Sequence, residues 1–442
     1  MAMADPVSSK RAAIALGAAL LALLVGWRVC SKGDPGKQAT EPAGSGTPVN
    51  GASGGSGERG PIGLSAPIAA AYAGNGEVVV AGLDAQAKVV RVQRIDANAK
   101  VVADGAAFDD LKWSADSDLK LVAHPTEGVA VTWRGLRGGK LVRQLAILGP
   151  DLANKGEPAE VDAASCATRD AIWFSDGAKA VARPWTGPSM KVDLPKDKDV
   201  SLLCGTSRAF AIVDDDDRTS LLTIGKEAGP AIAVIREGDF AEDEQRELAE
   251  YTIGDDVGFV RIGASGAIAV RELTSGALGP LRKLKATIPK DDDVVAVDAS
   301  SKILTIVHTQ DASSACPAEG SAVATKVTAL RIDRATFEES TVELSPGRCG
   351  HEVGPFFTGV LGDGVSIAWV ERSGGAGKAR APITALAHAT VMPSGTPALA
   401  HVDQPADALV DAGCDGKTCY AVALVRRETP DVPGLAKVLR YE

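Results

Sequence analysis

Aromatic residues are scarce in this sequence. Only 4% of its 442 residues are Phe, Trp or Tyr, although 45% are hydrophobic. The hydrophobic fraction excludes a disordered chain, and the scarcity of aromatics leaves the core to Val, Ala, Leu and Ile. Because β-branched side chains fit strands well, this composition favours β-structure.

Basic residues are also in the minority. The chain carries 47 Lys and Arg against 57 Asp and Glu, which gives a net charge of −10. No cluster of Lys and Arg is interleaved with aromatics. Since phosphate neutralisation requires such clusters, the sequence predicts no nucleic-acid partner.

Motifs for catalysis and metal binding are incomplete. His351-Glu352 begins an H-E-x-x-H pattern, but Pro355 occupies the position of the second ligand. Gly51–Gly55 (GASGG) matches G-x-S-x-G, yet its Gly- and Ser-rich surroundings cannot form the strand and helix of a hydrolase elbow. The cysteines lack C-x-x-C pairs, and no His lies at ligand spacing from another. The sequence therefore predicts no metal and no cofactor, and it supports no enzymatic activity without excluding one.

The first residues have the layout of an export signal. Lys10 and Arg11 precede an apolar run, Ala12–Trp27. The residues that follow, Arg28-Val29, do not fit a cleavage site and depart from the lipobox that Cys30 would need. We expect residues 1–29 to be a cytoplasmic tail and a single-pass signal-anchor helix.

Composition then divides the rest of the chain. Residues 30–62 are dense in Gly, Ser and Pro and poor in large apolar residues, which predicts a flexible linker with a reach on the order of 30 Å. From residue 63 to 442, short alternating runs rich in Val and Ile are separated by Gly, Asp, Asn and Pro turns. That pattern predicts one folded β-domain.

An internal repeat identifies the architecture. Leu194–Val213 (LPKDKDVSLLCGTSRAFAIV) aligns without a gap with Ile288–Val307 (IPKDDDVVAVDASSKILTIV), 94 residues further on. A diverged copy, Glu250–Val260 (EYTIGDDVGFV), falls on Leu203–Val213 at half that offset. The period is thus about 47 residues, which is the size of a four-stranded propeller blade.

The same pattern recurs through the whole domain. The second strands of eight units are expected to begin near Glu77, Gly128, Ala171, Ala209, Val257, Ile303, Gly364 and Thr418. We therefore predict an all-β fold, a β-propeller of eight blades with four antiparallel strands each, seven blades being the alternative. Asp239–Tyr251 is predicted to be a short acidic helix between units. Ala406–Tyr441 has room for three strands, and Ile62–Ser65 could supply the fourth and close the ring.

Three units share a strand that follows a turn and reaches a Trp: Gly128–Trp133, Ala171–Trp173 and Gly364–Trp369. This resembles the inner hairpin of bacterial extracytoplasmic β-propellers, without the signature of a characterised family. Trp133, Trp173 and Trp369 are interpreted as packing residues between blades. Trp113 and Trp185 fall outside this register and are the aromatic candidates for a ligand surface.

Six cysteines lie in the predicted domain, and an even number fits disulfides in an oxidising compartment. The predicted pairs are Cys414–Cys419 across an Asp-Gly hairpin turn, Cys316–Cys349 at one end of the propeller, and Cys166–Cys204 between neighbouring blades. The alternative is six buried, reduced thiols.

Aspartates cluster where the repeat places loops of one face. Asp116, Asp118, Asp197, Asp199, Asp291, Asp292 and Asp293 fall in loops between blades, and Asp214, Asp215, Asp216 and Asp217 fall in a middle hairpin loop. In a propeller both kinds of loop emerge on the same face. We predict an acidic face that recruits a cation or a basic partner. The alternative is that Asp is simply a good turn former in solvent-exposed loops.

These observations predict a membrane-tethered binding or scaffold module. The propeller would lie on the extracytoplasmic side, periplasmic or at the surface, and meet an envelope protein or a glycan. One alternative is a hydrolase or lyase with its site at the mouth of the central channel. Another is a structural envelope protein that packs against copies of itself.

Overall fold

The computed structural model describes residues 65–441, except 75, 85–88, 97, 99, 108–118, 125, 138, 162–165, 177, 197, 216–217, 237–244, 317–323, 374–382, 403–407, 415 and 426–434. The chain divides into two units, Met1–Gly57 and Glu58–Glu442, and the second contains every described residue. The predicted signal anchor and the whole predicted linker, Cys30 included, lie outside the described residues. Within them, no helix has the length and apolar character to cross a membrane.

The first four sheets follow one another along the chain. Blade 1 contains β1 (Ser65–Gly74), β2 (Glu77–Asp84), β3 (Val89–Ile95) and β4 (Val101–Ala107). Blade 2 contains β5 (Lys120–His124), β6 (Gly128–Arg137), β7 (Lys140–Leu148) and β8 (Ala159–Val161). Blade 3 contains β9 (Cys166–Ala167), β10 (Ala171–Asp176), β11 (Lys179–Pro184) and β12 (Met190–Asp193). Blade 4 contains β13 (Asp199–Cys204), β14 (Ala209–Asp215), β15 (Arg218–Ile224) and β16 (Ile232–Arg236).

The second half repeats the pattern with small variations. Blade 5 contains β17 (Gln245–Ile253), β18 (Asp256–Gly263), β19 (Ala267–Thr274), the short β20 (Ala277–Leu278) and β21 (Arg282–Thr287). Blade 6 contains β22 (Asp293–Ala299), β23 (Ile303–Asp311), β24 (Thr325–Asp333) and β25 (Glu339–Ser345), with the 3-10 turn η1 (Ser313–Ala315) after β23. Blade 7 contains β26 (His351–Leu361), β27 (Gly364–Ser373), β28 (Ile383–Val391) and β29 (Leu399–Val402). Blade 8 contains β30 (Ala408–Cys414), β31 (Cys419–Val425) and β32 (Leu435–Tyr441).

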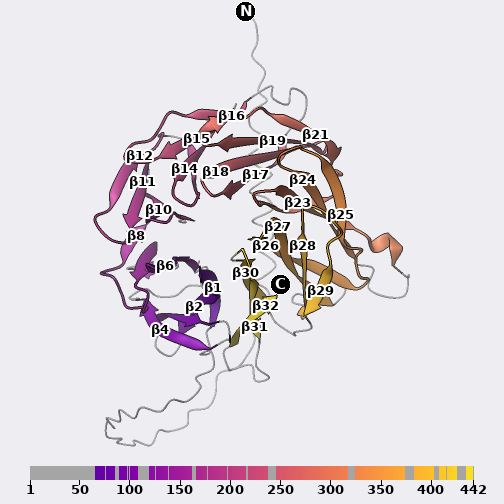
Figure 1. Cartoon of the computed structure of the whole chain (residues 1–442). Coiled ribbons are helices and arrows are strands. Elements are labelled where there is room, and N and C mark those ends of the chain that lie inside the picture. Colours follow the sequence, from indigo (N-terminus) through magenta and orange to yellow (C-terminus); the bar gives the residue numbers. More distant parts are fainter. Residues whose placement is uncertain are drawn as a thin grey trace, which may run out of the picture. The chain divides into compact units, whose positions relative to one another are not determined.

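These sheets form an eight-bladed β-propeller, as the repeat predicted. Figure 1 shows them around a ring, with first strands such as β1, β17 and β30 nearer the centre than outer strands such as β4, β16 and β25. Because neighbouring strands are antiparallel, successive loops emerge on opposite faces. We call the face with the inter-blade loops and the second-to-third strand loops the connection face. The opposite face, with the first-to-second and third-to-fourth strand loops, is the hairpin face.

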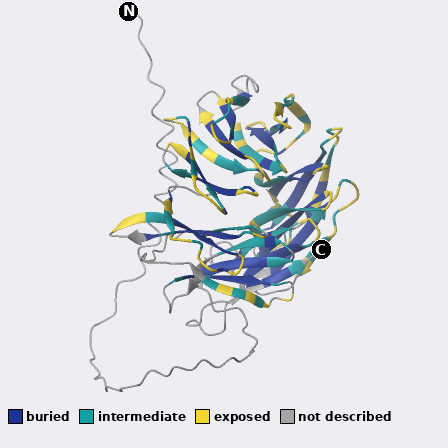
Figure 2. Cartoon of the chain, turned by 60° about the vertical axis from the view of Figure 1, so that its left-hand side comes forward, coloured by how far each residue is buried: buried dark blue, intermediate teal, exposed yellow. Residues whose placement is uncertain are grey.

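The core lies between blades rather than at one centre. The buried bands in Figure 2 run along the strands of every sheet, and the clusters join neighbouring sheets. Trp133 packs between blades 1 and 2, Trp173 between blades 3 and 4, and Trp369 between blades 6 and 7. All three indoles are buried. The interpretation of these tryptophans as packing residues is confirmed.

Blades 8 and 1 close the ring by packing. Val78 and Val422 belong to one buried cluster, and the rings of Tyr72 and Tyr420 stack with centroids 5.7 Å apart. Arg440 also donates a hydrogen bond to the carbonyl of Gly76. The predicted fourth strand of blade 8 is not seen among the described residues: Ser65 pairs with Leu83 of β2, and residues 62–64 lie outside them.

The helix predicted over Asp239–Tyr251 is wrong in its described part. Gln245–Ile253 is β17, and it forms an inner hairpin with β18, which confirms the register of Glu250–Val260. Tyr251 pairs with Gly258, and a Cβ at that glycine would overlap the tyrosine ring. The buried tyrosine ring lies against this glycine, where any larger residue would clash. Packing within the sheet therefore outweighs the helical tendency of the acidic sequence.

All three predicted disulfides are present. Cys166–Cys204 joins β9 to β13 with Cα atoms 5.7 Å apart, and Cys316–Cys349 spans 5.6 Å. Cys414–Cys419 joins residues that pair directly across the inner hairpin of blade 8. The alternative of six reduced thiols is therefore excluded in this structure.

Candidate functional site

Only part of the predicted acidic face can be placed. Asp116, Asp118, Asp197, Asp216, Asp217 and the aromatic candidate Trp113 lie outside the described residues, as does the side chain of Asp215. Asp199 and Asp214 lie on β13 and β14 of blade 4, and Asp291–Asp293 lie where the chain enters blade 6. Asp199, Asp214 and Asp293 are strand residues rather than the loop residues that were expected, and all of these described positions lie at strand ends on the connection face.

The strand register of blade 4 brings two of these aspartates together. Asp199 is the direct pairing partner of Asp214, and both side chains are exposed. The hydroxyl of Thr219 donates a 2.8 Å hydrogen bond to Asp214. No salt bridge joins either carboxylate to a basic residue in the described part of the chain. Like charges directly opposite one another in a sheet are an unfavourable pair.

Blade 5 adds two carboxylates that the sequence analysis missed. Burial raises the pKa of Glu250 on β17, and the neighbouring charges of Asp214 and Glu247 raise it further. The repulsion therefore extends across the boundary between blades 4 and 5. We call Asp199, Asp214, Glu247 and Glu250 the acidic junction.

The Asp291–Asp293 run does not extend this junction. Asp292 is buried, and its Oδ2 lies 2.7 Å from Nδ1 of the buried His308. Its carboxylate therefore binds a buried side chain of blade 6 and is not part of an exposed face. Asp291 and Asp293 are exposed, but blade 5 separates them from the acidic junction.

Two further carboxylates lie on innermost strands. Burial raises the pKa of Asp298 on β22 and raises that of Asp411 on β30 to about 6. The hydroxyl of Tyr420 donates a 3.1 Å hydrogen bond to Asp411, which offsets part of the effect of burial. These groups lie on different blades, so each has its own environment. Asp411 is the one whose pKa approaches neutrality, where acid–base chemistry is efficient.

A cavity of about 570 Å³ opens on the hairpin face at blades 2 to 4. Loops of three blades form it: Glu127 from blade 2, 168–170 and 185–188 from blade 3, and Ser207 and Gly225 from blade 4. Its remaining lining comes from strand residues Ala171, Trp173, Ala182, Pro184, Met190, Ala209 and Ile224. The volume falls in the range of small-molecule sites.

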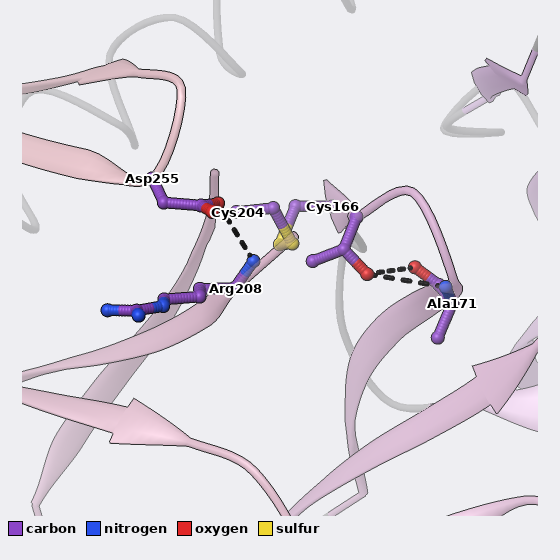
Figure 3. The surroundings of a disulfide bond; sticks show 6 residues. Cys166, Ala171, Cys204, Arg208 and Asp255 are labelled. Atoms are coloured by element: carbon purple, nitrogen blue, oxygen red, sulfur yellow. Dashed lines mark hydrogen bonds between the residues drawn. A yellow bond between two sulfur atoms is a disulfide. The ribbon is translucent and has the colours of Figure 1, made fainter. Parts of the chain in front are cut away.

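The disulfide Cys166–Cys204 lies in the strands that carry two of these loops (Figure 3). Next to it, the hydroxyl of Thr168 donates a 3.1 Å hydrogen bond to the carbonyl of Ala171, which fixes the turn of blade 3. The amide of Arg169 donates a 2.6 Å hydrogen bond to the carbonyl of Thr206 in blade 4. The cavity loops of blades 3 and 4 are thus held together by one covalent bond and by backbone hydrogen bonds.

Blade 5 supports the same loops from the other side. The amide of Thr206 donates a 2.8 Å hydrogen bond to the carbonyl of Gly254. The carboxylate of Asp255 accepts hydrogen bonds from the amides of Ser207, at 2.6 Å, and Arg208, at 3.1 Å. The hydroxyl of Ser207 also donates a hydrogen bond to this carboxylate, and with the two amides it holds the pKa of Asp255 below its usual value. The hairpin-face turns of blades 3, 4 and 5 therefore form one connected support beneath the cavity.

Trp185 contributes to the cavity wall and is only 5% exposed. Its ring lies 5.4 Å from that of His124, whose Nδ1 accepts hydrogen bonds from the amides of Thr126 and Glu127. The structure therefore places Trp185 at a cavity, as an edge of the wall rather than an open platform. Its role in ligand binding stays a prediction.

Comparisons with known proteins assign no family. No protein-family model matches the chain, and no curated protein matches its sequence. Among solved structures, the polysaccharide lyase Uly1 is 7% identical, with a TM-score of 0.42 over 87% of this chain and 90% of that one. The WD40 domain of SCAP from fission yeast is 9% identical, with a TM-score of 0.43 over 86% and 96%. Prolyl oligopeptidase B from Galerina marginata is 10% identical, with a TM-score of 0.43 over 71% and 46%. The assignment of the fold rests on the sheet topology above.

Proposed function

We propose that the protein is a membrane-tethered extracytoplasmic scaffold that binds a basic partner through the acidic junction. The observation that carries this proposal is the direct pairing of Asp199 with Asp214. Asp199 and Asp214 are like charges at directly paired positions, and burial together with the charge of Asp214 raises the pKa of Glu250, so carboxylates of this junction repel one another. A Lys or Arg from a partner removes that repulsion on binding, and electrostatic complementarity of this kind favours association.

The location is part of the same proposal. Three disulfides suit an oxidising compartment, and the sequence of residues 1–29 has the layout of a signal anchor. We expect the full chain to sediment with membranes and a chain lacking residues 1–29 to lose that association. Recovery of both chains in the soluble fraction would contradict the tether.

The junction is tested by capturing partners from native envelope extract with three full-length baits. The wild type is compared with D199N/D214N and with D291N/D293N, which removes two exposed charges from the same face outside the junction. Asn preserves side-chain size and can still accept the hydrogen bond from Thr219. A partner held by the wild type and by D291N/D293N, lost from D199N/D214N, and bound less tightly as salt rises supports the proposal. The same set of proteins on all three baits contradicts it.

A second candidate function is a hydrolase or lyase, and Asp411 is the observation that favours it. A carboxyl with a pKa of about 6, hydrogen-bonded to a tyrosine on an innermost strand, has the properties of a general acid or base. Cleavage of a polysaccharide or peptide by the wild type, abolished in D411N while the fold is retained, would establish this function. Activity that survives in D411N would remove Asp411 from consideration.

A further inference from the structure

The cavity on the hairpin face lies opposite the acidic junction and has a different chemical character. Pro184, Pro188 and Met190 are half-buried or exposed in its lining, and Trp173 and Trp185 complete the wall behind them. Its walls therefore offer apolar contact. The disulfide and the hydrogen bonds described above fix the surrounding loops, so a ligand that fits them pays little ordering cost.

Three polar side chains at the rim of the cavity make no hydrogen bond or ion pair with the described residues. Arg169 and Asp170 are exposed, and the backbone of each is fixed: the amide of Arg169 bonds to Thr206, and the carbonyl of Asp170 accepts a 3.3 Å hydrogen bond from the amide of Trp185. Among the described residues, no hydrogen bond or ion pair occupies the guanidinium of Arg169 or the carboxylate of Asp170. The hydroxyl of Thr186, also exposed, is equally uncommitted. The loop conformation thus depends on backbone contacts, while the side chains are available to a ligand.

These groups define the ligand's chemistry. A guanidinium donates, a carboxylate accepts and a hydroxyl does both, so the rim suits a ligand with both donors and acceptors. The opposite charges of Arg169 and Asp170 balance each other, and Glu127 in the lining lies 4.0 Å from the ammonium of Lys155, so the rim has little net charge and disfavours strongly charged ligands. A sugar ring has C–H groups on its faces and hydroxyls around its edge, matching apolar walls beneath a mixed polar rim.

We propose that this cavity binds one sugar unit of a neutral glycan. The inference does not depend on the acidic junction. Since the two sites lie on opposite faces, D199N/D214N is expected to leave sugar binding unchanged.

The test is titration of the full-length chain, in a detergent without a sugar headgroup, with cellotetraose and with the tetramer of N-acetylglucosamine. Calorimetry gives Kd, and tryptophan fluorescence reports on Trp173 and Trp185 in the wall. The test variant is R169A/D170N, which removes the guanidinium of Arg169 and the negative charge of Asp170 and leaves the backbone bonds in place. The control is R218A, an exposed arginine of blade 4 at the connection face.

We expect saturable binding of at least one tetrasaccharide, with Kd raised at least about tenfold in R169A/D170N, or about 1.4 kcal/mol, and unchanged in R218A. Thermal unfolding of both variants serves to confirm that they are folded. No binding to either sugar by the folded wild type overturns the proposal, as does an equal Kd in R169A/D170N. Tighter binding of the zwitterionic dipeptide glycylglycine than of both sugars overturns it as well.

Discussion

Asp411 makes the stability of the propeller depend on pH, and the direction follows from its environment. Its pKa in the folded protein is about 6, above the 3.8 of an unperturbed aspartate, because burial disfavours the charged form. The folded state therefore binds this proton more tightly than the unfolded state. The resulting stabilisation is fully present below pH 3.8 and is lost as the pH rises through 6.

The magnitude can be worked from the same values. The difference between 6 and 3.8 corresponds to about 3 kcal/mol of destabilisation once Asp411 is ionised. Asn is neutral at every pH and can accept the hydrogen bond from Tyr420. Above pH 7, D411N is therefore expected to be more stable than the wild type by up to about 3 kcal/mol. For a domain of about 380 residues this raises Tm by roughly 4 °C, since the entropy of unfolding scales with length.

The assay is thermal unfolding of the wild type and D411N at pH 4, 5, 6, 7 and 8, followed by circular dichroism. The difference in Tm should be near zero at pH 4 and should grow through pH 6 to a plateau. D291N is the control, because Asp291 is exposed and the difference in Tm is expected to stay flat. A difference for D411N that is the same at pH 4 and pH 8, or a D411N that is less stable at both, would refute the reasoning.

Three further perturbations test the packing and the bonds between blades. G258A places a methyl group against the ring of Tyr251 and should lower the free energy of unfolding by about 1–3 kcal/mol in denaturant unfolding. The control is A267G, on the half-exposed start of β19, which should lower it by about 1 kcal/mol or less. H308A leaves the carboxylate of Asp292 buried without its partner and should cost about 3–5 kcal/mol, and the double variant D292N/H308A should recover part of that loss. C166S/C204S removes the bond across a sequence separation of 38 and should cost about 2–4 kcal/mol, with faster amide hydrogen exchange at 168–170 and 205–208; unchanged exchange there would contradict the supporting role of the disulfide.

The fold could be predicted because the alternating strand pattern is local and recurs in every blade. Each blade begins its second strand within a residue of the position that the recurring strand and turn pattern indicated, from Glu77 to Cys419. The disulfide Cys166–Cys204 was readable for the same reason, since both cysteines occupy the same place in adjacent repeats. The helix predicted over Asp239–Tyr251 failed because its acidic, helix-favouring composition conceals a strand, of which the repeat alignment indicated only the end from Glu250 onward.

The sites depend on information that one repeat does not contain. The sequence places Asp199 and Asp214 at one end of the same hairpin, but their direct pairing follows from the strand register, which is set when the buried faces of β13 and β14 pack. Asp292 is buried with a hydrogen-bonding partner, His308, that lies sixteen residues further along the chain on β23. The cavity gathers loops from three blades, and its only advance signal was Trp185, an aromatic outside the repeat register. Arg169 and Asp170 gave no signal, since an exposed turn favours such residues anyway.

Propeller topology explains why the two proposed sites do not compete. Every strand of a blade runs from one face of the propeller to the other. The first and last residues of an innermost strand therefore lie on opposite faces. In blade 4, Asp199 begins β13 and belongs to the acidic junction, while the turn after Cys204 at its other end supports the cavity. The six residues of one strand therefore connect both sites through rigid, paired backbone. On the two proposals made above, a basic partner on one face and a glycan on the other would be held at once, which is the geometry that a scaffold requires.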